Sequence, residues 1–374
     1  MTDEQTLFAV FALFYALECL HWLPLNAVIL RTWAVRKGWA AGTPSVHASA
    51  SGNGLVVAWP LPPLGSLLVA QQWPVIPDLT GLWIGAGQLG EGNRLAWETL
   101  APRQEKRTIH LTTGVKVQCT SERAATLLAG FLRHAATESP DLRQKTIESF
   151  WQSSLSLPRA RAAVGRYQLA AQALRMPCVT VQFIAFAWIP ALFWRFGGSN
   201  WRVLAGFSSL LALTTWVAFI WRELDFRLFA DFRRKRWAQM LHLVFMPAHA
   251  IRAHDLIGVE ALAGLHPLAA ASVLLPRETL TAFASQTWRI WKFRPGDDAL
   301  APAAGTVLPR LADTLQRLGM TVADLEAAPS RQGAAASYCP RCHAQFTTSA
   351  TICGQCGGIP TRQWVAATDS QGLN

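Results

Sequence analysis

The chain has 374 residues, of which 51% are hydrophobic and only 15% carry charge. Soluble domains average about 25% charged residues, so this composition argues against a wholly soluble protein and indicates that much of the surface never meets water. The net charge of +11 and the 17 tryptophans are typical of a chain that lies against anionic lipid, because the indole ring prefers the bilayer–water interface. Nucleic acid is the other partner of a basic chain, but the basic residues cluster beside apolar segments, which favours lipid.

The cysteines and the N-terminus bear on the compartment. Four of the seven cysteines lie close together near the C-terminus, whereas Cys19, Cys119 and Cys178 are isolated, so the pattern is not a disulfide framework. Asp3 and Glu4 make the N-terminus acidic, whereas a secretory signal peptide begins with positive charge. We therefore interpret the first apolar run as a retained membrane anchor.

The first apolar run, residues 7–30, is long enough to cross a hydrocarbon core of about 30 Å. It predicts a transmembrane helix within residues 1–30. Glu18 and His21 lie in this run, three residues apart and therefore on one face of the helix. Ionisable groups inside a membrane are costly and are functional candidates by default. Their alternatives are an interhelical polar contact, a proton- or ligand-linked role, and a metal site.

Residues 31–157 are predicted to form a cytoplasmic α+β domain. Residues 46–90 are apolar but rich in proline and glycine, which a lipid-exposed helix cannot accommodate, so short strands are expected. Residues 108–119 alternate in polarity around a turn at Thr113 and Gly114, which predicts a β-hairpin. Ser121 is the expected N-cap of a helix that ends near residue 136, and residues 141–155 form a second helix.

Residues 85–90 match the dinucleotide-binding pattern G-x-G-x-x-G. The next residues, 91–93, begin a helix poorly, and the nucleotide interpretation requires a helix there. We interpret the segment as a glycine-rich loop.

Residues 158–221 combine a basic lead-in with a transmembrane helical hairpin. The apolar runs 178–196 and 203–221 are joined by the short loop 197–200 and flanked by tryptophans. Basic residues lie at the C-terminal end of the first apolar run, the N-terminal end of the second and the C-terminal end of the third. These ends share the cytoplasmic side only if the chain spans three times with its N-terminus outside.

Residues 222–326 are predicted to form a basic amphipathic and interfacial helical region. The basic residues between Arg222 and Arg236 alternate with phenylalanines, as in a helix lying on a membrane surface. Residues 238–251 and 256–275 are too short or too polar to be identified as spans, so we assign them to helices buried in protein or lying at the interface. Residues 238–275 contain His242, His249, His254, Asp255 and His266, which we interpret as ordinary interfacial residues, with a second metal or an acid–base site as the alternative. Further helices are expected over 279–293 and, as a hairpin turning at Gly319 and Met320, over 302–327.

The C-terminal part holds the most specific motif. Residues 327–337 are a predicted linker, 338–360 a zinc ribbon and 361–374 a polar tail. Two C-x-x-C pairs supply four thiolates, the preferred set for tetrahedral structural Zn²⁺: Cys339, Cys342, Cys353 and Cys356. Residues 338–358 resemble the short zinc-ribbon modules at the ends of many bacterial membrane proteins. The resemblance covers only this segment. It implies one structural zinc ion with no open coordination position.

Two alternatives apply to the metal. A rubredoxin-like iron site uses the same four thiolates. His343 stands where the modules often carry glycine, so it is a candidate substitute ligand.

The expected protein is an α-helical integral membrane protein with about three spanning helices, a cytoplasmic α+β domain and a C-terminal zinc ribbon. We expect a non-enzymatic scaffold or accessory subunit of a membrane complex in the inner (cytoplasmic) membrane, with its N-terminus outside and its C-terminus in the cytoplasm. Its ribbon would bind a protein partner, in preference to nucleic acid. The alternative is a membrane enzyme or transport component that uses Glu18, His21 and the histidines of residues 242–266.

Overall fold

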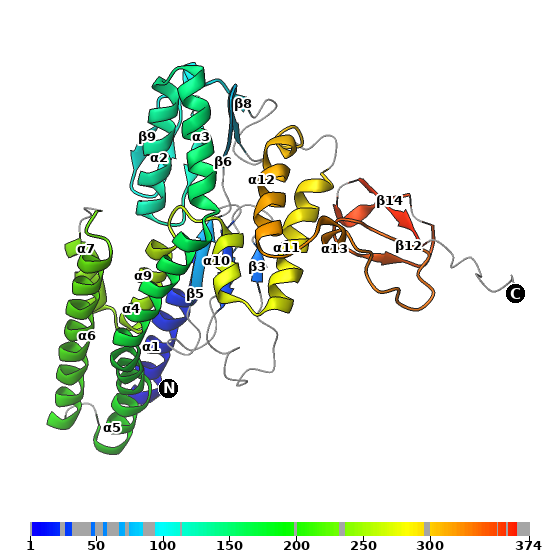
Figure 1. Ribbon diagram of the computed structural model, residues 1–374. Helices are drawn as coiled ribbons and strands as arrows, with labels where there is room; N and C mark the ends of the chain where they lie inside the picture. The colour runs from blue at the N-terminus through cyan, green and yellow to red at the C-terminus, as the bar shows by residue number, and fades with distance from the viewer. Residues whose placement is uncertain are drawn as a thin grey trace, which may run out of the picture. The chain divides into compact units, whose positions relative to one another are not determined.

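The computed structural model describes residues 2–22, 27–31, 46–48, 55–57, 67–71, 75–84, 94–112, 114–197, 200–231, 236–294, 300–349, 351–356 and 358–364. This part of the chain is mostly helical and contains two helices long and apolar enough to cross a membrane (Figure 1). The chain divides into two compact units. Unit 1 comprises residues 1–74, 101–134 and 152–275, and unit 2 comprises residues 75–100, 135–151 and 276–374.

The first predicted helix is shorter than expected. Helix α1 (Asp3–Cys19) has 17 residues, and the chain continues as strand β1 (Leu20–Trp22) and strand β2 (Ala27–Arg31). The prediction of one helix through residue 30 was therefore wrong. The sequence offers a reason, because Pro24 cannot continue a helix and Val28 and Ile29 are β-branched.

Short antiparallel strands follow, as the proline- and glycine-rich composition predicts. Strand β4 (Leu55–Val57) pairs with β1, and β2 lies between β3 (Val46–Ala48) and β5 (Leu67–Gln71). The predicted hairpin is confirmed by β10 (Thr108–His110) and β11 (Lys116–Gln118), to which β9 (Arg103–Glu105) adds a third strand. Gly114 adopts a φ of +77° in the turn, a conformation that favours glycine.

The two predicted helices after the hairpin are confirmed. Helix α2 (Glu122–Thr137) begins at Ser121, whose Oγ accepts a hydrogen bond from the Ala124 N–H at 3.0 Å. Helix α3 (Pro140–Ser154) follows it directly.

The two candidate spanning helices form a hairpin in unit 1. The first is continuous over helix α4 (Leu157–Phe183), the π-helical turn η2 (Ile184–Trp188) and helix α5 (Ile189–Phe196). The second is helix α6 (Trp201–Leu228), which packs on both α4 and α5. Asn200 caps α6 by accepting the Arg202 N–H at 3.0 Å.

The basic segment after the second candidate span does not form the predicted surface helix. Helix α6 continues through Leu228, and helix α7 (Arg236–Phe245) packs against α6. The Arg236 guanidinium lies 2.6 Å from the buried carboxylate of Asp225. Asp231 pairs with Arg123 at 2.9 Å. The first pair is buried and joins α6 to α7, and the second joins the chain after α6 to α2, so charged residues of this segment serve packing as well as the surface.

Three short helices complete unit 1 by packing along α4: α8 (Pro247–Ile251), α9 (Ala253–Ala261) and α10 (Pro267–Leu274). Their alanines at 250, 253, 269, 270 and 271 are fully buried. Small side chains permit close helix packing, which explains why these apolar stretches are buried in protein, one of the two placements that the sequence predicts.

Unit 2 contains a three-stranded antiparallel sheet of β6 (Val75–Asp78), β7 (Gly81–Ile84) and β8 (Arg94–Leu95). It also contains most of α3, together with α11 (Arg277–Lys292), α12 (Ala304–Arg317) and the single turn α13 (Val322–Leu325). The predicted turn at Gly319 is confirmed by a φ of +67°. The C-terminal ribbon belongs to the same unit.

Candidate metal centre

The C-terminal segment folds as two small antiparallel sheets. Strand β12 (Ser337–Tyr338) lies between β13 (Gln345–Phe346) and β16 (Arg362–Gln363), and β14 (Ile352–Cys353) pairs with β15 (Ile359–Pro360). Each C-x-x-C pair lies at the end of a strand, where the chain turns. Two knuckles therefore face each other across a very small core.

The four predicted cysteines come together. The sulfur atoms of Cys339, Cys342, Cys353 and Cys356 all lie within 4.8 Å of one another, and the Cys342 and Cys353 sulfurs are 3.8 Å apart. A tetrahedral site with metal–sulfur bonds of about 2.3 Å places its sulfurs roughly 3.8 Å apart. The cluster is therefore compatible with one metal ion.

The backbone around the knuckles favours thiolates. The N–H groups of Arg341 and Cys342 donate toward the Cys339 sulfur, and those of Gln355 and Cys356 toward the Cys353 sulfur. Burial, followed by the neighbouring cysteines, nevertheless raises the pKa of Cys356 above its usual range. Four adjacent sulfurs cannot all carry negative charge without a cation between them. The donor set thus fits a cationic metal.

His343 is placed differently from a substitute ligand. Its φ is +62°, the left-handed conformation that glycine favours. Its Nδ1 lies 2.9 Å from the Arg289 guanidinium, and burial together with Arg289 lowers the pKa of His343 to about 4. Across the described residues, the metal-binding cluster consists of the four cysteines and does not include His343.

The ribbon is attached to helix α11. Phe293, directly after α11, packs against the small core of Cys339, Cys353 and Ile359. The Arg362 guanidinium lies 5.0 Å from the centre of the Phe293 ring. Arg289 interacts electrostatically with the sulfurs of Cys342 and then Cys339. Sequence reasoning missed Arg289 and Phe293, because no local pattern links a helix to a motif about fifty residues later.

The segment predicted as a linker also contacts the ribbon. Gln345 donates to the Ser330 carbonyl and accepts from the Gln332 N–H, each at 2.8 Å. The Arg331 side chain bonds the Ala335 carbonyl. The described part of residues 327–337 is thus tied to the ribbon by hydrogen bonds.

The other predicted polar site does not assemble as expected. Helix α1 ends at Cys19, so Glu18 is helical. His21 instead lies in strand β1, where it pairs with Val56 of β4. The prediction that the two share a helical face was wrong, and their side chains lie outside the described residues. Residues 85–90, the glycine-rich loop, also lie outside them.

The histidines of residues 242–266 lie in three separate environments in unit 1. The rings of His242 and His249 stack 4.3 Å apart. His254 is buried, with its Nε2 3.4 Å from the Asp255 carboxylate, and burial lowers its pKa more than Asp255 raises it. The Nδ1 of buried His266 accepts the Leu268 N–H at 3.1 Å and so caps α10. These histidines do not form one site.

The assembled centre is therefore a four-cysteine cluster within a ribbon that contacts α11 through a cation and an aromatic ring. A tetrahedral ion held by four protein sulfurs has no position for a substrate. Comparisons of the chain with protein-family models, with curated proteins and with solved structures found no match.

Proposed function

We propose that this protein is a non-enzymatic membrane scaffold, or an accessory subunit of a membrane complex, whose ribbon binds a protein partner. The observation that carries the proposal is the closed set of four cysteine sulfurs. Such a set stabilises a fold and presents a surface, but it does not supply a catalytic metal. We assign the ion as one structural Zn²⁺, because zinc prefers four thiolates in a tetrahedron. Iron held in the same way is the alternative.

Membrane insertion is supported by the exposure of the two candidate spans. Only 28% and 33% of the residues in their apolar windows are buried, whereas the apolar core helix of a soluble protein is mostly buried. Large exposed side chains along both helices include Met176, Phe183, Trp194, Leu204, Trp216 and Phe219. Lipid is the solvent that such a surface requires.

The scaffold proposal is tested by the size of the native complex. Full-length protein is extracted from its membrane in mild detergent and its mass is compared with that of Cys339→Ser/Cys353→Ser. We expect the wild type in an assembly larger than a monomer and the double variant released from it. Cys119→Ser is the matched control, because Cys119 is a buried thiol outside the cluster. A wild-type protein that is monomeric and free of other chains would refute the scaffold.

A second function is favoured by a different observation in unit 1. Arg252, His254, Asp255 and Glu260 are all buried around α9, and Arg252 lies 3.1 Å from Asp255. Buried ionisable groups are frequent in transport components and enzymes, so this cluster supports a membrane enzyme or transporter using the 242–266 region. Loss of the native phenotype in Asp255→Asn, with no effect of the double cysteine variant, would favour this second function.

A further inference from the structure

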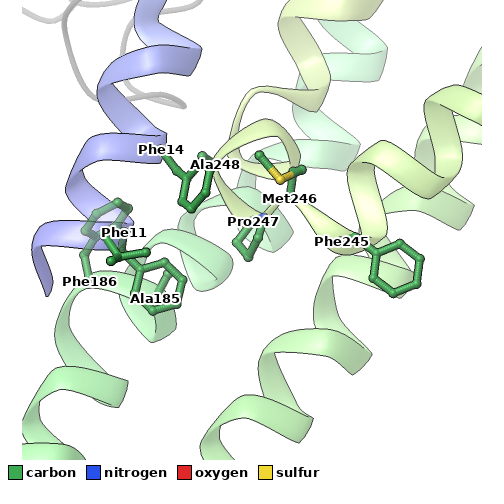
Figure 2. A pocket seen from close by; sticks show the side chains of 9 residues that line it. Phe11, Phe14, Ala185, Phe186, Phe245, Met246, Pro247 and Ala248 are labelled. Carbon is green, nitrogen blue, oxygen red and sulfur yellow. The ribbon is translucent and has the colours of Figure 1, made fainter. Parts of the chain in front are cut away.

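Unit 1 contains an apolar cavity of about 260 Å³ beside the π-helical turn. All nine residues that line it are apolar, and they come from α1, from η2 and from the corner between α7 and α8. Figure 2 shows Phe11 and Phe14 of α1 near Ala185 and Phe186, with Met246, Pro247 and Ala248 opposite. The volume exceeds the roughly 150 Å³ of an engineered apolar cavity that binds benzene.

The π-helical turn has a local cause. Pro190 has no N–H to donate, and its ring would clash with the carbonyl of Phe186 in a regular α-helix. The chain widens instead, and the Ile189 N–H bonds the Ile184 carbonyl, five residues earlier. Such insertions are frequent at functional sites. Here the widened turn contributes Ala185 and Phe186 to the wall of the cavity.

Helix α1 provides the facing wall through an aromatic cluster. The Phe186 ring lies 6.3 Å from Phe11 and 5.2 Å from Tyr15, both edge-on. Phe8 contacts the same ring at 6.5 Å. Edge-to-face arrangements are favoured for aromatic pairs, so these contacts stabilise the packing of α1 against the π-helical turn that lines the cavity.

The rim of the cavity is apolar and open to the exterior. Val10 is 44% exposed, Phe14 42% and Phe245 67%. Exposed Phe183 and Trp188 each lie two residues from the lining residues Ala185 and Phe186 on one continuous helix, so the cavity lies beside the apolar surface for which we propose lipid contact. Polar side chains come next to this lining in the chain: His249 follows the lining residue Ala248, hydrogen-bonds Gln239 and stacks on the exposed ring of His242. A ligand with a hydrophobic chain and a hydrogen-bonding headgroup could therefore place the chain in the apolar cavity and the headgroup near Gln239, His242 and His249.

We propose that this cavity binds one acyl chain of a membrane phospholipid, with the headgroup at Gln239, His242 and His249. The inference rests on the proposed membrane insertion. It follows from a lining without any polar side chain, an opening among exposed apolar residues, and the hydrogen-bonding side chain of His249 next in the chain to the lining residue Ala248. A water-soluble ligand would leave the exposed aromatic rim in contact with water.

The test uses full-length protein in phosphatidylethanolamine vesicles that contain phosphatidylglycerol with a diazirine at the end of one acyl chain. A carbonate wash first establishes whether the protein is embedded. After illumination, lipid adducts are mapped by mass spectrometry. We expect adducts on residues 10–14 and 245–248 to exceed those on the exposed residues Leu204, Ala205, Ser208, Ser209, Leu211 and Ala212 of α6 by several-fold.

Ala248→Leu fills part of the cavity and should reduce these adducts several-fold. Ala212→Leu is the matched control, because Ala212 is exposed on α6 away from the cavity, and it should change nothing. Phe14→Ala enlarges the space and should keep the adducts even if Ala248→Leu fails to fold. Equal labelling of cavity and α6 in embedded protein would overturn the inference while leaving membrane insertion intact. Release of the protein by the carbonate wash would instead refute membrane insertion.

Discussion

Arg289 contacts the metal centre, although no sequence pattern links it to the cysteine motif. It reaches His343, 54 residues later in the chain, and its charge acts on the sulfurs of Cys342 and Cys339. A cation beside a four-thiolate centre offsets the centre's negative charge, and residues that support metal ligands typically contribute about 10–100-fold in metal affinity. We expect Arg289→Gln to weaken zinc retention by about tenfold, measured by competition with a colorimetric chelator.

Arg317→Gln provides the control for that measurement. Arg317 is 55% exposed and pairs with Asp313 one turn earlier on α12, an interaction worth little in water. Zinc retention should equal that of the wild type. Equal retention in the Arg289 and Arg317 variants would show that the Arg289 charge does not support the centre.

His343 gives a second prediction at the residue scale. Its left-handed φ of +62° suits glycine, and its ring contacts Arg289. We expect His343→Gly to retain one zinc per chain, measured by elemental analysis of purified protein, because the four sulfurs complete the tetrahedron. Cys342→Ser should lose the ion. Loss of zinc in His343→Gly would instead identify this histidine as a ligand.

At the scale of elements, the sequence predicts what is local and misses what depends on the tertiary fold. The β10–β11 hairpin, the Ser121 cap and the cysteine knuckles each depend on residues close together in the chain, and all are present. Composition could not locate the end of α1 at Cys19, because Leu20–Trp22 still belongs to the first apolar run and forms a strand by pairing with residues more than thirty positions away. The α6–α7 corner was missed for the same reason, since the Asp225–Arg236 pair forms only when the helices pack.

The cap of α10 makes a prediction about pH. Burial lowers the pKa of His266 to about 4, against about 6.5 in an unfolded chain. Between these values the unfolded chain binds a proton that the folded protein does not, so stability is retained above pH 6.5 and lost as the pH falls toward 4. The loss is about 3 kcal/mol at most, because each unit of pKa is worth 1.36 kcal/mol.

His266→Asn tests this, because asparagine also caps helices but does not titrate. Thermal unfolding of both proteins in detergent should show a smaller loss of stability in the variant between pH 6.5 and 4. Parallel pH dependences would show that His266 is not the group responsible.

Under the proposed membrane insertion, helix α1 decides between two and three crossings. Its 17 residues span about 26 Å, slightly less than a hydrocarbon core of about 30 Å. With three crossings the N-terminus lies outside, and with two it lies with the C-terminus. We expect reporter fusions to place the N-terminus outside and the C-terminus in the cytoplasm. An N-terminal reporter active inside would remove α1 from the spans, and a C-terminus outside would overturn the topology.

For the whole molecule, the two units differ in what should stabilise them. Unit 1 holds the exposed apolar helices and the apolar cavity, so under the proposed membrane insertion its stability should depend on lipid. Unit 2 holds the cysteine cluster, so its stability should depend on metal. Sequence composition indicates both requirements. The division itself could not be predicted, because each unit is assembled from three separate stretches of chain.

Metal removal should therefore act on unit 2 alone. A structural zinc ion contributes directly to the folding free energy of its domain, and chelation unfolds such domains. Because Phe293 packs on the cysteine core, we expect chelation to open residues 330–364 and to expose the end of α11. Limited proteolysis of full-length protein in membranes should then cut after about residue 290 and spare α4 and α6, and added Zn²⁺ should restore protection. Cys353→Ser should behave like chelated protein without chelator. Unchanged protection after complete zinc removal would show that the ribbon is held by its strands and by α11 rather than by the metal.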